Sequence, residues 1–166
     1  MGIRYIKEPG LTDPVMIAAW PGIGNIGLIA LDTLRRSLRA EQMAYIEPYQ
    51  FFYPKKVIIR GGELVELDFP TSEFFYHGSG KRDLILFMGE EQPAEGGGVY
   101  AAGSMAYSMA NLVLDVAEKY KCRRIYTSGA AVAPIHHTAR SRAWAVPNAE
   151  GLIAEFKGYD LSLIHI

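Results

Sequence analysis

The sequence has little cysteine, no excess of charge of either sign and no long apolar run, and each absence excludes a class of protein. The single cysteine, Cys122, excludes an internal disulfide and a cysteine-rich zinc site. Seventeen basic against eighteen acidic residues give a net charge of −1, which provides no electrostatic reason to bind nucleic acid or an anionic membrane. The apolar runs are far shorter than a membrane span. We therefore expect a cytoplasmic protein with no nucleic-acid or membrane partner.

The amino-acid composition is that of an ordinary globular domain. With 49% apolar and 21% charged residues, a chain of 166 residues can bury a sizeable core in about one domain. We predict a single domain over residues 1–160. The final letters, "LSLIHI", look like a translated sequencing adapter, so we expect residues 161–166 to be a non-native tail and the domain to be incomplete at its C-terminus. The alternative is that these letters form a short apolar strand.

Continuous apolar runs alternate with helical patterns along the chain. Runs at residues 15–20, 83–89 and 123–129 predict strands buried on both faces. Patterns of helical period predict helices over residues 26–39 and 104–120. The segment "KKVIIRGGELVELDF" predicts a hairpin that turns at Gly61 and Gly62. This order of elements is typical of an α/β fold with a mostly parallel, mixed sheet covered by helices on both faces.

The segment "WPGIGNIG" joins the first buried strand to the first helix. Gly22, Gly24 and Gly27 have the G-x-G-x-x-G spacing of a dinucleotide-binding turn, and Asn25 stands at the N-cap position of the helix. Pro21 and the lack of a second crossover unit count against a bound cofactor, so we expect none. The favoured interpretation is a structural corner that lets the helix pack tightly on the sheet. Binding of another anion, or of a partner, remains an alternative.

We predict that the face of the first helix opposite its charged stripe is apolar. The charged stripe consists of Asp32, Arg35, Arg36 and Arg39, and the opposite face consists of Ile26, Ala30, Leu34 and Leu38.

Acidic side chains follow the second buried strand. Glu90, Glu91 and Glu95 lie where ligands bind in open α/β sheets, and they could act as acid–base groups or bind a cation. Surface acids on a solvated loop are the commoner explanation of such residues. Glu47 stands twenty residues after Gly27, where a dinucleotide fold carries its ribose-binding acid.

The loop after the third buried strand offers no convincing chemistry. Ser128 lacks the flanking glycines of a nucleophile elbow. The adjacent His136 and His137 point to opposite sides of an extended segment, which makes a poor metal clamp. Arg140 and Arg142 could hold a phosphate or carboxylate. We therefore predict no catalytic residue and no metal site.

An aromatic segment, "EPYQFFYP", lies between two prolines. Tyr49, Phe51, Phe52 and Tyr53 are either core residues or a partner surface, because aromatic side chains are enriched in both places. A second group, Phe74, Phe75 and Tyr76, follows in "EFFYHG".

In this succession the chain resembles the proteasome assembly chaperone 2 family over about residues 15–156. The likeness rests on "WPGIGNIGLIALDTL", "EPYQFFYP", "DLILFMGEEQP" and "RRIYTSGAA" in the family's order. The resemblance implies a three-layer α/β/α sandwich similar to the nucleoside phosphorylase/hydrolase-like fold, and no settled catalytic activity. Relatives in eukaryotes and archaea help to assemble proteasome rings, whereas many bacterial relatives have no assigned role. The ending "LIHI" departs from the hydrophobic-Tyr-x tail of some relatives, and the family domain runs further.

Three functions stay open on the sequence alone. The first is a non-catalytic protein-binding module with proteasome subunits or itself as partner, forming a homo-oligomer. The second is an enzyme or sensor that binds a phosphorylated or nucleotide-like molecule at Gly22, Gly24, Asn25 and Gly27, with Glu90 or Glu91 beside it. The third is a dinucleotide-dependent reductase.

Overall fold

The computed structural model describes residues 2–93, 103–134, 136–140, 142–156, 159 and 161–163. The chain divides into two units, residues 1–131 and residues 132–166. The prediction of one domain over residues 1–160 with a non-native tail at residues 161–166 stays a prediction. None of the helices in the described ranges is long and apolar enough to cross a membrane.

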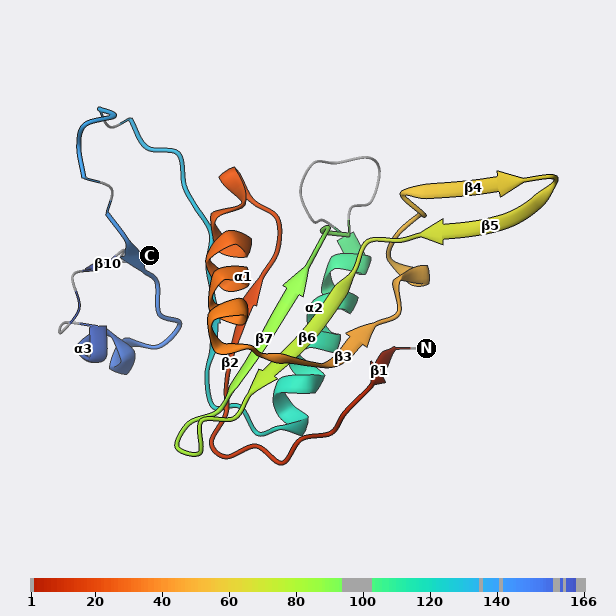
Figure 1. Cartoon of the computed structure of the whole chain (residues 1–166). Helices are drawn as coiled ribbons and strands as arrows, with labels where there is room; N and C mark the ends of the chain where they lie inside the picture. The colour runs from red at the N-terminus through yellow and green to blue at the C-terminus, as the bar shows by residue number, and fades with distance from the viewer. Residues whose placement is uncertain are drawn as a thin grey trace. The chain divides into compact units, whose positions relative to one another are not determined.

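A six-stranded mixed sheet forms the centre of the first unit (Figure 1). In spatial order its strands are β1 (Ile3–Tyr5), β3 (Glu41–Ile46), β6 (Ser72–His77), β7 (Leu84–Gly89), β2 (Val15–Ala19) and β8 (Ile125–Thr127). β2 pairs in parallel with β7 on one side and with β8 on the other, so Met16 lies between Ile85 and Ile125. The prediction that three apolar strands lie side by side in one sheet is confirmed.

Two strands of this sheet, β1 and β6, are not predicted from the sequence. They run against the other four strands of the sheet and form its antiparallel pairs, β1–β3, β3–β6 and β6–β7. The sheet is mixed, as predicted, but its parallel pairing is limited to β7, β2 and β8 because β6 is inserted between β3 and β7. β8 is an edge strand in the described part of the sheet, so its side chains are exposed and the prediction that it is buried is wrong.

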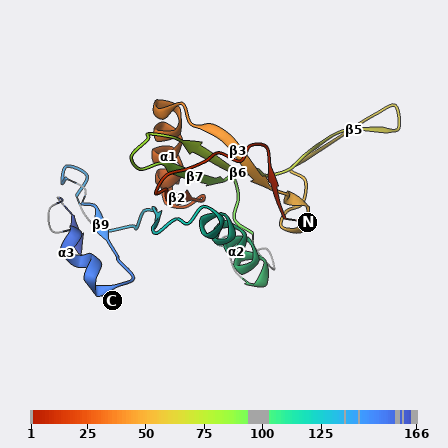
Figure 2. The same ribbon diagram turned by 90° about the horizontal axis from the view of Figure 1, so that it is seen from below.

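Two helices cover opposite faces of the sheet (Figure 2), which gives the expected three layers. α1 (Ile26–Leu38) packs against Ala19, Phe75 and Leu86 through Leu31. α2 (Gly103–Lys119) packs on the other face, where the larger core lies, through the buried residues Met109, Val113, Val116 and Ala117. The core on the α2 face consists of Met16, Ala18, Met43, Ala44, Ile46, Phe51, Phe74, Ile85, Phe87, Met109, Val113, Val116 and Ala117.

The buried face of α1 differs from the predicted one. The buried residues of this helix are Gly27 and Leu31, whereas Ile26 and Ala30 are exposed. The predicted face begins at Ile26 and Ala30, one residue before the buried positions Gly27 and Leu31. Gly27 has no side chain, so it adds nothing to the apolar pattern from which the face is predicted.

A separate two-stranded hairpin belongs to the first unit. It consists of β4 (Lys56–Arg60) and β5 (Glu63–Asp68), which confirms the predicted hairpin, and a short 3-10 helix, η2 (Pro48–Gln50), precedes it. Gly61 and Gly62 have φ angles of +60° and +86°, as a two-residue turn with two left-handed positions requires. Figure 1 shows the hairpin standing away from the six-stranded sheet.

The second unit contains short elements. β9 (Trp144–Ala145) pairs in parallel with β10 (Ser162–Leu163), and η3 (Glu150–Leu152) continues into α3 (Ile153–Phe156). The last three residues, 164–166, lie outside the described ones.

Candidate functional site

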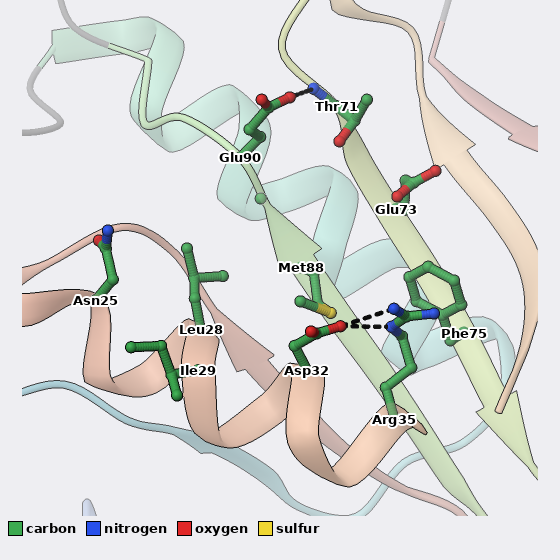
Figure 3. A pocket seen from close by; sticks show the side chains of 11 residues that line it. Asn25, Leu28, Ile29, Asp32, Arg35, Thr71, Glu73, Phe75, Met88 and Glu90 are labelled. Atoms are coloured by element: carbon green, nitrogen blue, oxygen red, sulfur yellow. Dashed lines mark hydrogen bonds and ion pairs between the residues drawn. The ribbon is translucent and has the colours of Figure 1, made fainter. Parts of the chain in front are cut away.

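A groove of about 630 Å³ lies between α1 and the neighbouring strands β6 and β7 (Figure 3). It brings together two of the six predicted ligand-binding residues, Asn25 and Glu90. The other four, Gly22, Gly24, Gly27 and Glu91, are not among its described lining residues. Two layers of the fold contribute to it, helix α1 and the sheet, and its lining is Asn25, Leu28, Ile29, Asp32, Arg35, Thr71, Glu73, Phe75, Met88, Gly89 and Glu90.

The glycine segment forms the corner that begins one wall of this groove. The amide of Asn25 donates to the carbonyl of Gly22 at 2.9 Å, which closes η1 (Ile23–Asn25). Gly24 and Asn25 both have left-handed backbone angles, with φ of +64° and +50°. Asn25 occupies the N-cap of α1, as predicted. Its side chain does not cap the helix, however, because Oδ1 accepts a hydrogen bond from the amide of Gly22 at 3.4 Å.

Gly27 is the point at which α1 touches the chain that follows β8. A Cβ atom on Gly27 would lie 2.6 Å from the carbonyl oxygen of Ser128 and 3.0 Å from its Oγ. A Cβ atom on Gly22 would meet nothing within 4 Å. A real Cβ cannot approach an oxygen to 2.6 Å, so this glycine sets how closely the helix lies on the sheet. The contact supports the interpretation of the segment as a structural corner, and the proposed anion-binding role of Gly22, Gly24, Asn25 and Gly27 stays a prediction.

The ends of β2 and β7 are also in close contact. Trp20 packs directly on Gly89, where a Cβ atom would lie 2.6 Å from Cδ1 of the indole, and its ring centroid is 4.9 Å from that of Phe87. The side-chain amide of Gln92 donates to the carbonyl of Pro21. The two loops that leave the carboxyl ends of these parallel strands are therefore held together.

An ion-pair cluster on α1 forms one side of the groove. Asp32 accepts hydrogen bonds from Arg35, at 2.7 Å from Nη2 and 3.0 Å from Nε, and pairs with Arg36 at 2.7 Å. Hydrogen bonding from Arg35, helped by the charges of both arginines, lowers the pKa of Asp32 despite its partial burial. The guanidinium carbon of Arg35 lies 4.8 Å from the centroid of the Phe75 ring. Arg35 thus already contacts both the carboxylate of Asp32 and the ring of Phe75.

Glu90 connects the end of β7 to the base of the hairpin. Its Oε1 lies 2.5 Å from Nζ of Lys55, and its Oε2 accepts from the amide of Thr71 at 2.9 Å. Burial acts to raise the pKa of Glu90, but the hydrogen bonds from Lys55 and Thr71 outweigh it and lower the pKa. Glu91 is exposed, and Glu95 lies outside the described residues.

Glu73 is half-buried on β6 and differs from the other two acids of the groove. Its Oε1 accepts from Nε2 of Gln42 at 2.8 Å, and within the described part of the chain it forms no ion pair. Burial raises its pKa, the charge of Arg35 opposes this, and the charge of Glu90 adds to it. Asp32 pairs with Arg35 and Arg36, and Glu90 pairs with Lys55, so Glu73 is the lining acid without a cation partner among the described residues. At Glu73 the groove therefore favours a cation over an anion.

Glu47 has a structural contact that explains its position. Its carboxylate accepts from Nε of Arg4 at 2.7 Å and from the amide of Gly2 at 3.1 Å, which fastens β1 to the end of β3. The hydrogen bond from Arg4, followed by that from Gly2, lowers the pKa of this carboxyl group. In a dinucleotide site an acid at this position would bind the ribose, but the carboxylate of Glu47 is already bound to Arg4 and Gly2.

The structure divides the predicted aromatic surface. Tyr49 and Tyr53 are exposed, at 70% and 93% of their surface, whereas Phe51 is 8% exposed and belongs to the core on the α2 face. Phe52 is partly buried and packs against the same core. Phe51 is therefore removed from the candidate partner surface, because its ring is used in packing.

The histidine pair makes no metal site with other described residues. The rings of His136 and His137 have centroids 4.3 Å apart, so the prediction that they point to opposite sides is wrong. Nδ1 of His136 lies 2.8 Å from Oγ1 of Thr138. Among the described residues, no group of three or more His, Cys, Asp and Glu side chains could hold a metal ion.

One surface that the sequence analysis misses is an apolar face of the hairpin. The register places Val57 opposite Leu67 and Ile59 opposite Leu64, and these four residues are named the hairpin's apolar face. They are between 47 and 65% exposed, as is Val65 at the bulge beside them. The other face carries Lys56 opposite Asp68, Ile58 opposite Glu66 and Arg60 opposite Glu63. The alternation in "KVIIRGGELVELD" is the signal that could have revealed this face.

Comparisons with solved structures return several similar chains. PbaB of Pyrococcus furiosus, described as an archaeal proteasome activator, is 26% identical with a TM-score of 0.77 over 99% of this chain and 66% of its own. PbaA of the same organism, an archaeal homolog of proteasome-assembly chaperone, is 16% identical with a TM-score of 0.67 over 99% of this chain and 64% of its own. A proteasome-assembly chaperone homologue of Mycobacterium tuberculosis is 20% identical with a TM-score of 0.57 over 75% of this chain and 52% of its own.

The chain thus spans less than two thirds of the length of these solved structures. The comparison with curated proteins finds no match. A model of the PAC2 family matches residues 16–163, which confirms the resemblance seen in the sequence. The match covers nearly the whole chain, and the chain belongs to the PAC2 family.

Proposed function

We propose that this chain is a non-catalytic protein-binding module with a chaperone-like role, whose partners are proteasome components or a second copy of itself. Membership of the PAC2 family and the likeness to PbaB support this proposal. The observation that carries it is the hairpin's apolar face, where four large apolar side chains are exposed on one side of a two-stranded ribbon. The cytoplasmic location and the homo-oligomeric state remain part of the proposal.

A two-stranded ribbon with an exposed apolar face is unfavourable in water. An isolated two-stranded hairpin is marginally stable in water, and a contiguous exposed apolar patch is typical of an interaction site. Covering the patch removes apolar area from water, which contributes a favourable transfer free energy of about 25 cal/mol for each Å². The costs of association are subtracted from this gain. The polar face, with Lys56 and Glu66 paired at 3.5 Å, keeps the other side of the hairpin solvated.

Contacts of Lys55 hold the base of the hairpin in place, and this favours binding of a partner. The amide of Lys55 donates to the carbonyl of Asp68 at 2.7 Å, and its Nζ lies between Glu90 at 2.5 Å and Asp68 at 3.8 Å. Because this end is held in place, a partner would order fewer degrees of freedom when it docks.

The alternative of a phosphorylated or nucleotide-like ligand at the glycine corner has weaker support. Such a ligand would place its charge near Glu73 and Glu90, and the cation in the groove, Arg35, is already paired with Asp32. It stays a prediction that thermal-shift measurements with phosphate, nucleosides and nucleotides can test.

The proposed function is tested by affinity purification of the tagged protein from its host, with quantitative identification of what is bound. Ile59→Glu disrupts the hairpin's apolar face, whereas Arg60→Gln changes the neighbouring residue on the polar face. We expect the same partner, proteasome subunits or untagged copies of the chain, with wild type and Arg60→Gln, and a loss of at least about tenfold with Ile59→Glu. Equal recovery with all three forms would overturn the proposal.

A further inference from the structure

The groove of about 630 Å³ has both apolar and acidic side chains in its lining. Leu28, Met88 and the ring of Phe75 supply apolar surface (Figure 3). Glu73 lies two residues before Phe75 on β6 and is paired with Met88 of β7. Figure 3 shows Glu73 on β6 between the ion-pair cluster of Arg35 and the carboxylate of Glu90. A ligand for this groove must therefore offer both a flexible apolar part and a polar end.

The charges of the groove are unevenly compensated. Asp32 has two arginine partners, and Glu90 has Lys55 and the amide of Thr71. Glu73 receives one hydrogen bond, from the neutral amide of Gln42, and forms no ion pair with the described residues. A half-buried carboxylate in this state gains most from a cationic donor, since charge-assisted hydrogen bonds are about twice as strong as neutral ones.

We propose that this groove receives a lysine or arginine side chain from a protein partner, with the cationic head on Glu73 and the stem along Leu28, Met88 and Phe75. The inference rests on the proposed protein-binding function and names the chemistry of the partner at a second contact. Lysine and arginine fit because their methylene stems cover apolar surface while the charged head stays at a polar position.

A metal ion fits the groove less well. Calcium and magnesium ions need several oxygen ligands, and no group of three or more candidate ligand side chains gathers in the described part of the chain. A phosphate fits less well still, because it would meet the carboxylate of Glu73, which has no ion pair among the described residues, and an arginine that Asp32 already engages.

The test is a titration of the labelled protein followed by ¹H–¹⁵N NMR. The probes are Nα-acetyl-lysine amide and Nα-acetyl-arginine amide, with Nα-acetyl-norleucine amide as the uncharged analogue and inorganic phosphate and AMP as anions. We expect the basic probes to shift the amide signals of Glu73, Phe75 and Met88, and the norleucine and anionic probes to leave them in place.

Two variants separate the groove from general surface charge. Glu73→Gln keeps an oxygen for the Gln42 hydrogen bond and removes the charge, so it weakens binding of the basic probes about tenfold. Glu118→Gln removes an exposed acid on α2, which covers the other face of the sheet, and leaves binding unchanged. The inference is overturned if the basic probes do not bind, if Glu73→Gln binds them as wild type does, or if the norleucine amide or an anion binds equally well.

The two proposals fail in distinguishable ways. If the basic probes miss the groove while the host partner still depends on Ile59, only the groove inference is wrong. If the probes bind at Glu73 but no partner depends on Ile59, the groove recognises a cation and the proposed function is wrong.

Discussion

At the scale of single residues, Gly27 and Gly22 have opposite surroundings although both belong to one motif. A Cβ atom on Gly27 would collide with the carbonyl of Ser128 at 2.6 Å, whereas Gly22 has open space and an extended φ of −160°. We predict that Gly27→Ala lowers the free energy of unfolding by about 1–3 kcal/mol, because α1 must move off the sheet. Gly22→Ala is the matched control and should change it by less than about 0.5 kcal/mol. Urea denaturation measures both, and equal effects would show that the motif does not act through packing.

Asp83 is a buried acid whose hydrogen bonds make its contribution to stability depend on pH. Its Oδ1 accepts from the amides of Ser79 and Gly80 at 2.7 and 3.2 Å, and its Oδ2 accepts from that of Thr12 at 2.7 Å. The hydrogen bond from Thr12, followed by those from Ser79 and Gly80, lowers the pKa of Asp83 below 3.8 despite desolvation. Because the folded pKa is the lower one, the stabilisation is present above pH 3.8 and is lost as the pH falls through the folded value.

We therefore predict that Asp83→Asn lowers the free energy of unfolding by about 2 kcal/mol at neutral pH, since an amide nitrogen would face one of the backbone donors. Below pH 3.8 the difference between the variant and wild type should shrink. Chemical denaturation across a pH series measures this difference. A difference that stays constant down to the acid-unfolding region would contradict the role assigned to the carboxylate.

At the scale of elements, the hairpin depends on Glu90 for its attachment. Glu90→Gln keeps an acceptor for the amide of Thr71 and removes the ion pair with Lys55. We expect faster hydrogen exchange at the amides of β4 and β5, and unchanged exchange in β2 and β7, because the core strands do not depend on this contact. Mass-spectrometric exchange measures both groups. Equal acceleration in all four strands would mean that Glu90 stabilises the whole unit instead.

The elements differ in how far the sequence predicts them. β2, β7 and α2 follow directly from apolar runs or helical period, and Gly61-Gly62 locates the hairpin turn. β6 is missed because its aromatic residues serve both faces of the sheet, with Phe74 towards α2 and Phe75 towards α1. Such a strand has no alternation to detect.

At the scale of the whole molecule, the candidate groove is only partly predictable. Asn25 and Glu90 are found because they follow strands whose carboxyl ends meet at one edge of the sheet. Glu73 and Arg35 are missed, because their meeting requires β6 to lie beside β7 and opposite α1. That pairing joins segments distant in sequence, and no local pattern specifies it.

The central claim is that protein covers the hairpin's apolar face in the cell. The most direct test places the photo-crosslinking amino acid p-benzoylphenylalanine at position 59 or at position 60 of the full chain and irradiates the living host. Ile59 and Arg60 are neighbours on opposite faces of β4. The two labelled proteins should therefore have the same expression level, fold and location in the cell. The account predicts covalent adducts with one defined protein, a proteasome component or a second copy, from position 59 and few from position 60. Equal adducts from both positions, or none from position 59, would contradict it.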